Sequence, residues 1–276
     1  MPLMDPPDSP ASSSDSTGSQ HHYIISTATD ADVRRLVDIE FHAFENERAN
    51  QQLSFRDQDK PDHLERTVQM YGKVVRDGQA AAKLGRQKPS SRDRGQTLGH
   101  TETRLLKVTD VDTGDIVSFA KTEIKTYTED ELVSAADSGH EQDPQMNRNW
   151  FALNERLRRE YMGTRRHCYI AMLATEPRFQ HNGAGTMLLE TILADADNAG
   201  LEVYLEGTDT AKAMYLKHGF RAVNDIYFDP SKYGMDALGI EHQTVMVRGA
   251  LDTDGSGQRR QVRAWSSVVA GAEIRS

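Results

Sequence analysis

The stretch from Arg178 to Glu190, RFQHNGAGTMLLE, leads into a predicted helix whose first turn holds glycine and no acid. An ordinary helix favours Asp or Glu there, because N–H groups without partners and the helix dipole make this end positive. Gly183 and Gly185 let the backbone approach a ligand closely, since glycine has no Cβ atom. The exposed N–H groups therefore predict an anion site, to which Arg178 and His181 can add positive charge.

The residues after this turn exclude two common phosphate motifs. A nucleotide P-loop requires Gly-Lys followed by Ser or Thr, and no such triplet follows Gly185. A dinucleotide fingerprint requires a third glycine three residues later, where Leu188 stands. The bound phosphate must therefore belong to another class of ligand.

The elements around the motif predict an α/β layer structure, in which strands and helices alternate. The run HCYIAMLAT, residues 167–175, is almost continuously apolar and predicts a central, buried strand. The helix that follows carries an apolar face and ends near Gly200, which suits a left-handed cap. A strand, a helix and two further strands are predicted after it, at 201–208, 210–220, 221–228 and 242–249.

The first half of the chain supplies the elements that flank this unit. A short strand at 23–26 precedes a helix with a capping-box-like start, Thr29-x-x-Asp32. A second helix is expected at Lys60–Val75, and residues 103–124 read as a hairpin around Asp-Thr-Gly-Asp. Residues 149–162 have helical amphipathic spacing, and their charged run RLRRE at 156–160 is expected to be a solvated helix face.

Two motifs together resemble a known superfamily. Gln180-x-x-Gly183-x-Gly185 is similar to the pyrophosphate signature of the GCN5-related N-acetyltransferase (GNAT) superfamily, Q/R-x-x-G-x-G/A. The later segment 211–220, A-x-x-M-Y-x-x-x-G-F, matches a second pattern of that family. The resemblance rests on motifs over 167–228 and on element order over 23–125. It implies an α/β (α+β) GNAT-like fold: a central mixed, mostly antiparallel sheet of about six to seven strands, flanked by helices, with the acyl-CoA site where the two central parallel strands splay.

The resemblance implies an acetyl-CoA-dependent N-acetyltransferase that transfers an acetyl group to an amine by direct attack in a ternary complex. A catalytically silent acyl-CoA-binding sensor or scaffold domain remains the alternative. No metal is expected, because the histidines show no H-x-H or H-E-x-x-H spacing. The residues expected to bind acetyl-CoA are Leu173, Ala174, Thr175, Gln180, His181, Asn182, Gly183, Ala184, Gly185 and Thr186.

Tyr215 stands at the family position of the general acid, which would protonate the departing thiolate. The general base is left open between Glu206 and His167, which end and begin the two central strands. Histone acetyltransferases of the superfamily carry a Glu on the strand before the motif, where this chain has Tyr169. This departure argues against a histone-type mechanism.

The expected organisation is a disordered tail at 1–21, a single N-acetyltransferase domain at 22–249 and a largely flexible C-terminal tail at 250–276. Polar insertions are expected near 76–100 and 126–150. An apolar patch around Trp265, Val268 and Val269 offers one place where the C-terminal tail could dock.

The amino-acid composition disfavours some classes of binding partner. A formal net charge of −9 argues against nucleic acid and anionic membranes, and slightly favours a cationic acceptor. The resemblance implies a small-molecule or peptide amine as the partner, selected by the loops Phe44–Asp59 and Asp229–Glu241, and the protein is expected to be a monomer or homodimer. A lone cysteine, Cys168, excludes a disulfide framework and favours the cytoplasm, or alternatively the nucleus.

Overall fold

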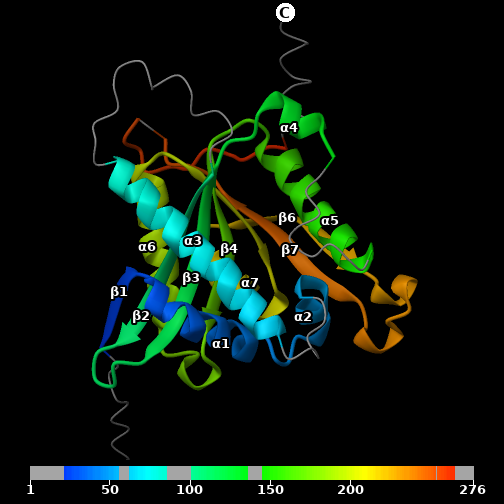
Figure 1. Cartoon of the computed structure of the whole chain (residues 1–276). Coiled ribbons are helices and arrows are strands. Elements are labelled where there is room, and N and C mark those ends of the chain that lie inside the picture. Colours follow the sequence, from blue (N-terminus) through cyan, green and yellow to red (C-terminus); the bar gives the residue numbers. More distant parts are fainter. Residues whose placement is uncertain (1–21, 56–61, 86–100, 136–144, 253, 265–276) are drawn as a thin grey trace, which may run out of the picture.

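Seven strands form one sheet in the order β1-β2-β3-β4-β5-β7-β6 (Figure 1). The structure, a computed structural model, describes residues 22–55, 62–85, 101–135, 145–252 and 254–264. The strands are β1 (Tyr23–Thr27), β2 (Glu102–Asp110), β3 (Ile116–Lys125), β4 (His167–Thr175), β5 (Glu202–Gly207), β6 (Arg221–Phe228) and β7 (Glu241–Arg248). The α-helices are α1 (Val33–Ala43), α2 (Arg48–Ser54), α3 (His63–Gly85), α4 (Glu129–Val133), α5 (Gln145–Met162), α6 (Ala184–Asn198) and α7 (Asp209–Lys217).

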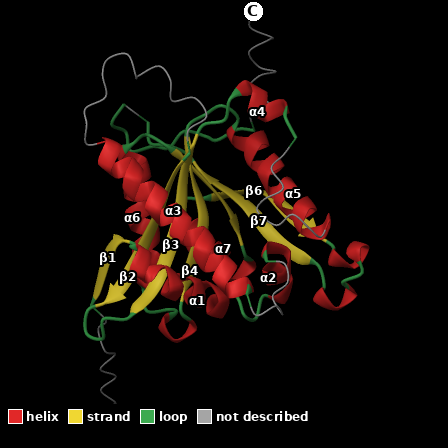
Figure 2. Ribbon diagram, viewed as in Figure 1, coloured by secondary structure: helices red, strands yellow, loops and turns green. Residues whose placement is uncertain are grey.

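Neighbouring strands of the sheet run antiparallel except for the central pair, β4 and β5, which are parallel. This mixed, mostly antiparallel sheet confirms the predicted fold class. The parallel pairing is short: it joins His167 to Glu202, Cys168 to Val203 and Tyr169 to Tyr204. Beyond Tyr169 the two strands diverge, and Figure 2 shows the sheet fanning open along their length. The divergence leaves backbone groups of β4 free to contact a ligand.

A β-bulge lies in β4 at Ala171. Thr122 of β3 faces Ile170, whereas the adjacent Lys121 faces Met172, so Ala171 is the extra residue. Because side chains alternate between the two faces of a strand, one extra residue exchanges the faces for everything after it. Leu173 therefore packs with Ile170 in the core beneath α6, and Met172 turns toward α1 and α3.

Helices cover both faces of the sheet. Helices α6 and α7 pack over one face, where the completely buried Leu188 and Leu189 of α6 contribute to the largest core cluster. Burying each such leucine stabilises the fold by roughly 1.5–3 kcal/mol. Helices α1 and α3 cover the opposite face at β2 to β4, and α5 covers the β5, β6 and β7 region (Figure 1). The splayed strands thus lie between two helical layers.

The helices differ from expectation in several places, and α5 also begins earlier than predicted, at Gln145. The helix predicted at Lys60–Val75 begins at His63 and continues to Gly85, into the segment predicted as a polar insertion. Helix α2 lies within the predicted acceptor loop, where no periodic pattern indicated it. Helix α4 has a complete capping box, in which Thr128 and Glu131 exchange hydrogen bonds, and this was the overlooked signal.

The described beginning of the C-terminal tail is anchored to the domain. Leu251 forms an isolated bridge with Arg259, and the Arg259 guanidinium binds both carboxylate oxygens of Asp197 on α6, at 2.7 and 2.8 Å. Trp265, Val268 and Val269 lie outside the described residues, as does the predicted N-terminal tail. No helix in the described ranges has the length and apolar character that crossing a membrane requires.

Candidate active site

The turn between β4 and α6 holds backbone conformations that suit glycine. Gly183 is the N-cap of α6 with φ +88°, and His181 two residues earlier has φ +63°. At Gly185, a Cβ atom would lie 3.1 Å from Oγ1 of Thr175 at the end of β4. The two glycines therefore have different roles: Gly183 allows the backbone conformation of the turn, and Gly185 allows α6 to approach β4 closely.

The N-terminus of α6 presents unpaired N–H groups. The first helical hydrogen bond is donated by Met187 N–H to the Gly183 carbonyl, at 2.9 Å, so Ala184, Gly185 and Thr186 have no intrahelical acceptor. The first turn contains no acid. Arg178 points elsewhere, since its guanidinium binds Asp115 at 3.3 Å. Any positive potential at this turn therefore comes from the backbone N–H groups and the helix dipole rather than from Arg178.

A cavity of about 900 Å³ extends from this turn through the gap between β4 and β5. Nearly all of the residues predicted to bind acetyl-CoA line it, and Asn182 does not. The lining members of that set are Leu173, Ala174, Thr175, Gln180, His181, Gly183, Ala184, Gly185 and Thr186. The tertiary structure thus brings the splayed strand and the glycine turn to one continuous space.

Tyr215 of α7 lines the same cavity. Its ring packs edge-on against Phe220, with ring centroids 5.6 Å apart, and lies against Gly207 of β5. Burial raises the pKa of its phenol well above the ordinary value, so the hydroxyl remains protonated at neutral pH. A protonated hydroxyl beside the splayed strands can donate a hydrogen bond or a proton to a group held there.

Glu206, near the end of β5, also lines the cavity. Burial raises the pKa of its carboxyl, and the charge of Arg158 and the hydroxyls of Tyr169 and Tyr204 oppose this shift in part. Its Oε1 atom is buried and has no hydrogen-bond partner among the described residues. A carboxylate with a raised pKa that borders a cavity is a better proton acceptor than an ordinary glutamate.

The structure does not bring His167, the other candidate base, to the cavity. Its ring is completely buried at the start of β4 and stacks on Tyr127, with centroids 5.8 Å apart. Nδ1 lies 2.8 Å from the Arg165 carbonyl, and burial lowers the imidazole pKa to about 4. A neutral, enclosed histidine at this place has a packing role.

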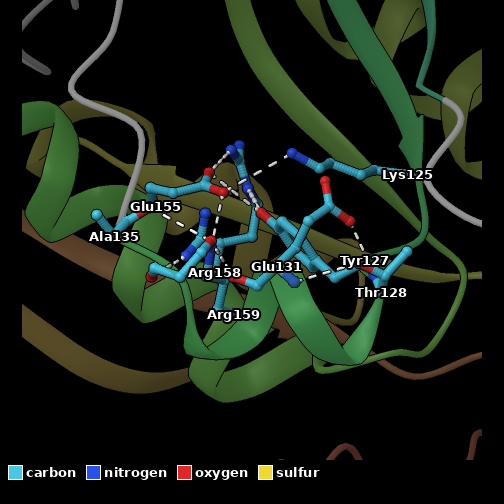
Figure 3. A network of polar contacts seen from close by, with 9 residues as sticks. Lys125, Tyr127, Thr128, Glu131, Ala135, Glu155, Arg158 and Arg159 are labelled. Atoms are coloured by element: carbon cyan, nitrogen blue, oxygen red, sulfur yellow. Dashed lines mark hydrogen bonds and ion pairs between the residues drawn. The ribbon is translucent and has the colours of Figure 1, made fainter.

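Figure 3 shows a network of polar contacts, three members of which, Lys125, Glu155 and Arg158, line the cavity. Arg158 of α5 binds Glu155 and donates from Nε to the Tyr127 hydroxyl at 2.6 Å. Burial acts to raise the pKa of Glu155, but the charges of Arg158 and of Lys125 outweigh it and lower the pKa. The guanidinium also lies 4.0 Å from the ring centre of Tyr169, on the strand that borders the cavity.

This network corrects the expectation that 156–160 is a solvated helix face. Arg158 and Arg159 are largely buried, while Arg156 and Glu160 are exposed. The overlooked signal was Glu155, placed three and four residues before these two arginines on the same side of the helix. An arginine side chain can lie on the buried side of a helix when such a carboxylate pairs with it.

Sequence reasoning missed several residues at the far end of the cavity. The loop Phe44–Asp59 was expected to select the acceptor, and its described part contributes Phe44, Glu47, Asn50, Ser54 and Phe55 to the cavity lining. No described residue of the second expected loop, 229–241, lines the cavity, because this loop packs on α5 instead: Asn149 donates to the Tyr233 hydroxyl at 2.7 Å. Glu40 of α1 was visible in the sequence as an acid within an apolar helical stripe.

Comparison with known proteins agrees with this architecture. Residues 106–220 match the model of the acetyltransferase (GNAT) family. The structure resembles the mosquito arylalkylamine N-acetyltransferase-like protein 5b, with 10% identity, a TM-score of 0.53 and coverage of 82% of this chain and 99% of that chain. It also resembles a Drosophila melanogaster polyamine N-acetyltransferase, with 12% identity, a TM-score of 0.52 and coverage of 82% of this chain and 98% of that chain. At such identities these likenesses show the fold alone. No curated protein matches the sequence.

Proposed function

Residues 106–220 belong to the acetyltransferase (GNAT) family, and from this premise we propose that the chain is an acetyl-CoA-dependent N-acetyltransferase. It transfers the acetyl group directly to an amine while both substrates are bound. One observation carries the proposal. A single cavity joins the anion site at α6, the gap between β4 and β5, a buried tyrosine and a buried carboxylate.

The residues present fit acetyl-CoA. The N–H groups of Ala184, Gly185 and Thr186 hold the pyrophosphate, and the absence of an acid in this turn avoids charge repulsion. The edge of β4 from Leu173 to Thr175, released from β5 by the divergence, pairs with the amide-rich pantetheine arm as a strand would. When bound, acetyl-CoA supplies the acetyl group as an activated thioester.

The bulge at Ala171 has a chemical use in this arrangement. A residue left out of the β3–β4 ladder frees a backbone N–H, which can donate to the thioester carbonyl as negative charge develops on its oxygen. The donor belongs to a central strand and needs no reorganisation when the reaction occurs. Polarising the carbonyl is the electrostatic part of the proposed catalysis.

Glu206 and Tyr215 handle the protons. An alkylamine has a pKa of about 10 and is mostly protonated at neutral pH, so Glu206 accepts a proton from it, directly or through water. The amine nitrogen then forms the new C–N bond as the C–S bond breaks, and it loses its second proton to solvent to give the neutral amide. Tyr215 donates its hydroxyl proton to the departing thiolate and is restored from solvent. The products are the N-acetylated amine and free CoA.

The proposal is tested by measuring CoA release from acetyl-CoA against a broad panel of small amines and N-terminal peptides. We expect amine-dependent release, and a kcat that falls about 100-fold in Tyr215→Phe. Tyr227→Phe is the matched control, because Tyr227 is 69% exposed and outside the cavity lining. An unchanged kcat in Tyr215→Phe would remove this residue as the acid. Acetyl-CoA binding without release for any amine would support the silent acyl-CoA-binding alternative.

A further inference from the structure

The imidazole of His242 lies between two carboxylates that belong to different elements. Its Nδ1 atom is 3.0 Å from a carboxylate oxygen of Asp209, the first residue of α7, and its Nε2 atom is 3.1 Å from Oδ1 of Asp225 on β6. His242 itself is the second residue of β7, the strand between β5 and β6 in the sheet. One side chain therefore joins the start of a helix to the strand at the edge of the sheet.

Only the charged form of this imidazole can donate to both carboxylates. A neutral histidine carries a proton on one ring nitrogen and a lone pair on the other, so one of the two contacts would place a lone pair against a negative oxygen. The imidazolium carries a proton on both nitrogens and forms two charge-assisted hydrogen bonds. The contact between α7 and β6 therefore depends on the charge of this ring.

The residues around the ring hold it in this orientation. The ring stacks on that of Tyr227, the residue opposite it on β6, with centroids 4.6 Å apart and an angle of 19° between the ring planes. Asp225 is held in turn by the Thr244 hydroxyl at 3.0 Å and by Lys212 of α7 at 3.8 Å. The imidazolium and Lys212 together balance the charges of the two aspartates, so loss of the ring proton leaves one negative charge in excess.

The charged groups that face His242 favour its protonated form. The hydrogen bond to Asp209 is the main cause that raises the pKa of His242 above 6.5, and the hydrogen bond to Asp225 adds to it, while partial burial of the ring opposes the shift. Glu241, the preceding residue on β7, adds a further carboxylate. Burial raises the pKa of Glu241 to about 7, and the charge of His242 opposes that shift.

Helix α7 supplies part of the cavity wall. Thr208, its N-cap, and Ala211 in its first turn line the cavity, as does Tyr215 one turn further. The first hydrogen bonds of the helix are donated by the N–H groups of Ala211 and Lys212 to the Thr208 carbonyl, at 3.1 and 3.0 Å. The carboxylate that His242 contacts belongs to this same turn, so the charge of the ring acts on the wall that precedes the proposed acid.

We propose that His242 is a pH-sensitive clamp: its imidazolium ties the first turn of α7 to β6, and loss of the ring proton releases this turn and the part of the cavity wall that it supplies. A histidine beside one carboxylate would lose only an attraction on deprotonation, whereas here the neutral ring also brings a lone pair against an anion. The clamp requires neither acetyl-CoA nor an amine, so it is independent of the proposed acetyl transfer.

The titration of the ring is measured by NMR in the ligand-free protein. Glu40 and Glu241 also titrate near pH 7, so global stability would not isolate the clamp, whereas the His242 ring signals do. We expect a midpoint above 6.5 that moves down by about 0.5 or more in Asp209→Asn and in Asp225→Asn, because each variant removes one carboxylate. The signal of His22, which lies 3.7 Å from the exposed Asp112, should not move in these variants.

Hydrogen exchange measures whether α7 responds to this titration. The protection factor of the Lys212 amide, which corrects for the intrinsic effect of pH on exchange, should fall about tenfold or more between pH 6 and pH 8.5. His242→Arg carries a charge that does not titrate in this range and should keep the protection nearly constant. His242→Gln should show low protection at both pH values. The Met187 amide, in the first turn of α6, is the control and should not change.

The outcomes are distinct from those of the acetyl-transfer assay. A His242 midpoint at or below 6.5, or equal protection of Lys212 at both pH values, overturns the clamp. A pH response that persists in His242→Gln also overturns it, because it assigns the response to another group such as Glu241. If an amine substrate is found, the ratio of kcat in wild type to kcat in His242→Arg should be near one at pH 6 and fall about threefold or more at pH 8.5, since protonation of the amine cancels in this ratio. A constant ratio overturns the effect on the cavity wall.

Discussion

The Tyr71 hydroxyl of α3 donates a 2.6 Å hydrogen bond to Oε2 of Glu40 on α1. Glu40 is 2% exposed, and burial raises its carboxyl pKa to about 7, although this hydrogen bond and the charge of Lys121 oppose the shift. A carboxyl on the helix that borders the cavity therefore titrates near physiological pH. The pair also joins the two helices that cover this face of the sheet.

Glu40 should make the stability of the protein depend on pH. The folded state binds this proton more tightly than the unfolded chain does, so the contribution is complete below about pH 4.5 and is lost as pH rises through 7. Glu40→Gln should therefore be more stable than wild type at pH 8, by about 2 kcal/mol, with a much smaller difference at pH 5. Urea unfolding at both pH values measures it, and Glu65→Gln on the exposed side of α3 is the control. A difference independent of pH would contradict the assignment.

A negative charge in the first turn of α6 should abolish binding of acetyl-CoA. Thr186→Glu places a carboxylate where the pyrophosphate is proposed to bind, and the two anions repel each other. Wild type should show a rise in Tm as acetyl-CoA exceeds Kd, and Thr186→Glu should show none at millimolar ligand. Thr186→Gln, similar in size but neutral, should retain most of the rise. Equal shifts in the two variants would place the pyrophosphate elsewhere.

Gly207 should control the position of Tyr215. A Cβ atom added there would lie 3.3 Å from Cδ2 and Cε2 of the tyrosine ring, closer than ordinary van der Waals contact. Gly207→Ala should therefore lower kcat about tenfold, by moving the proposed acid, while KM for acetyl-CoA changes little. Gly78→Ala is the control, because its Cβ atom meets the Thr103 carbonyl at the same distance, away from the cavity lining. A lowered Tm with normal kcat would indicate a packing role alone.

The ion pairs of Asp197 with Arg248 and Arg259 should stabilise the domain above acidic pH. Burial acts to raise the pKa of Asp197, but the hydrogen bonds from Arg259 and Arg248 outweigh it and lower the pKa to about 2. The contribution is thus present above pH 4 and is lost as pH falls through 2. Arg259→Ala should destabilise the protein by about 1 kcal/mol at pH 7 and less at pH 3. Arg260→Ala, an exposed neighbour, should have no such effect.

Local patterns predicted much of the site. Gly183 and Gly185 predict a helix start without acids, and the apolar run before them predicts a buried strand. Both predictions work because backbone freedom and side-chain polarity are properties of short segments. The location of the bulge at Ala171 could not be predicted in this way. It depends on which residue of β3 faces which residue of β4, and no local pattern encodes that register.

The surroundings of charged residues also depend on the tertiary structure and not on local sequence patterns. Arg158 was expected on a solvated helix face, yet the structure buries it with Glu155 beside Tyr127. His167 and Glu206 were equivalent candidates for the base in the sequence, and access to the cavity separates them: the ring of His167 stacks on Tyr127 away from the cavity lining, whereas Glu206 lines the cavity. The solvation of a side chain and the shape of a cavity depend on segments that lie far apart in the sequence, so a linear motif does not encode them.

The sequence by itself determined the order of the elements, the acid-free helix start at α6 and the resemblance that the family match over residues 106–220 bears out, because these depend on glycine positions, periodicity and spacing within about sixty residues. Only the tertiary structure decided how the cavity is charged. Glu47 lies in the turn between α1 and α2, Glu206 belongs to β5, and both line the cavity. Their electrostatics depend on the distances to other charges and on lost solvent, and folding creates both.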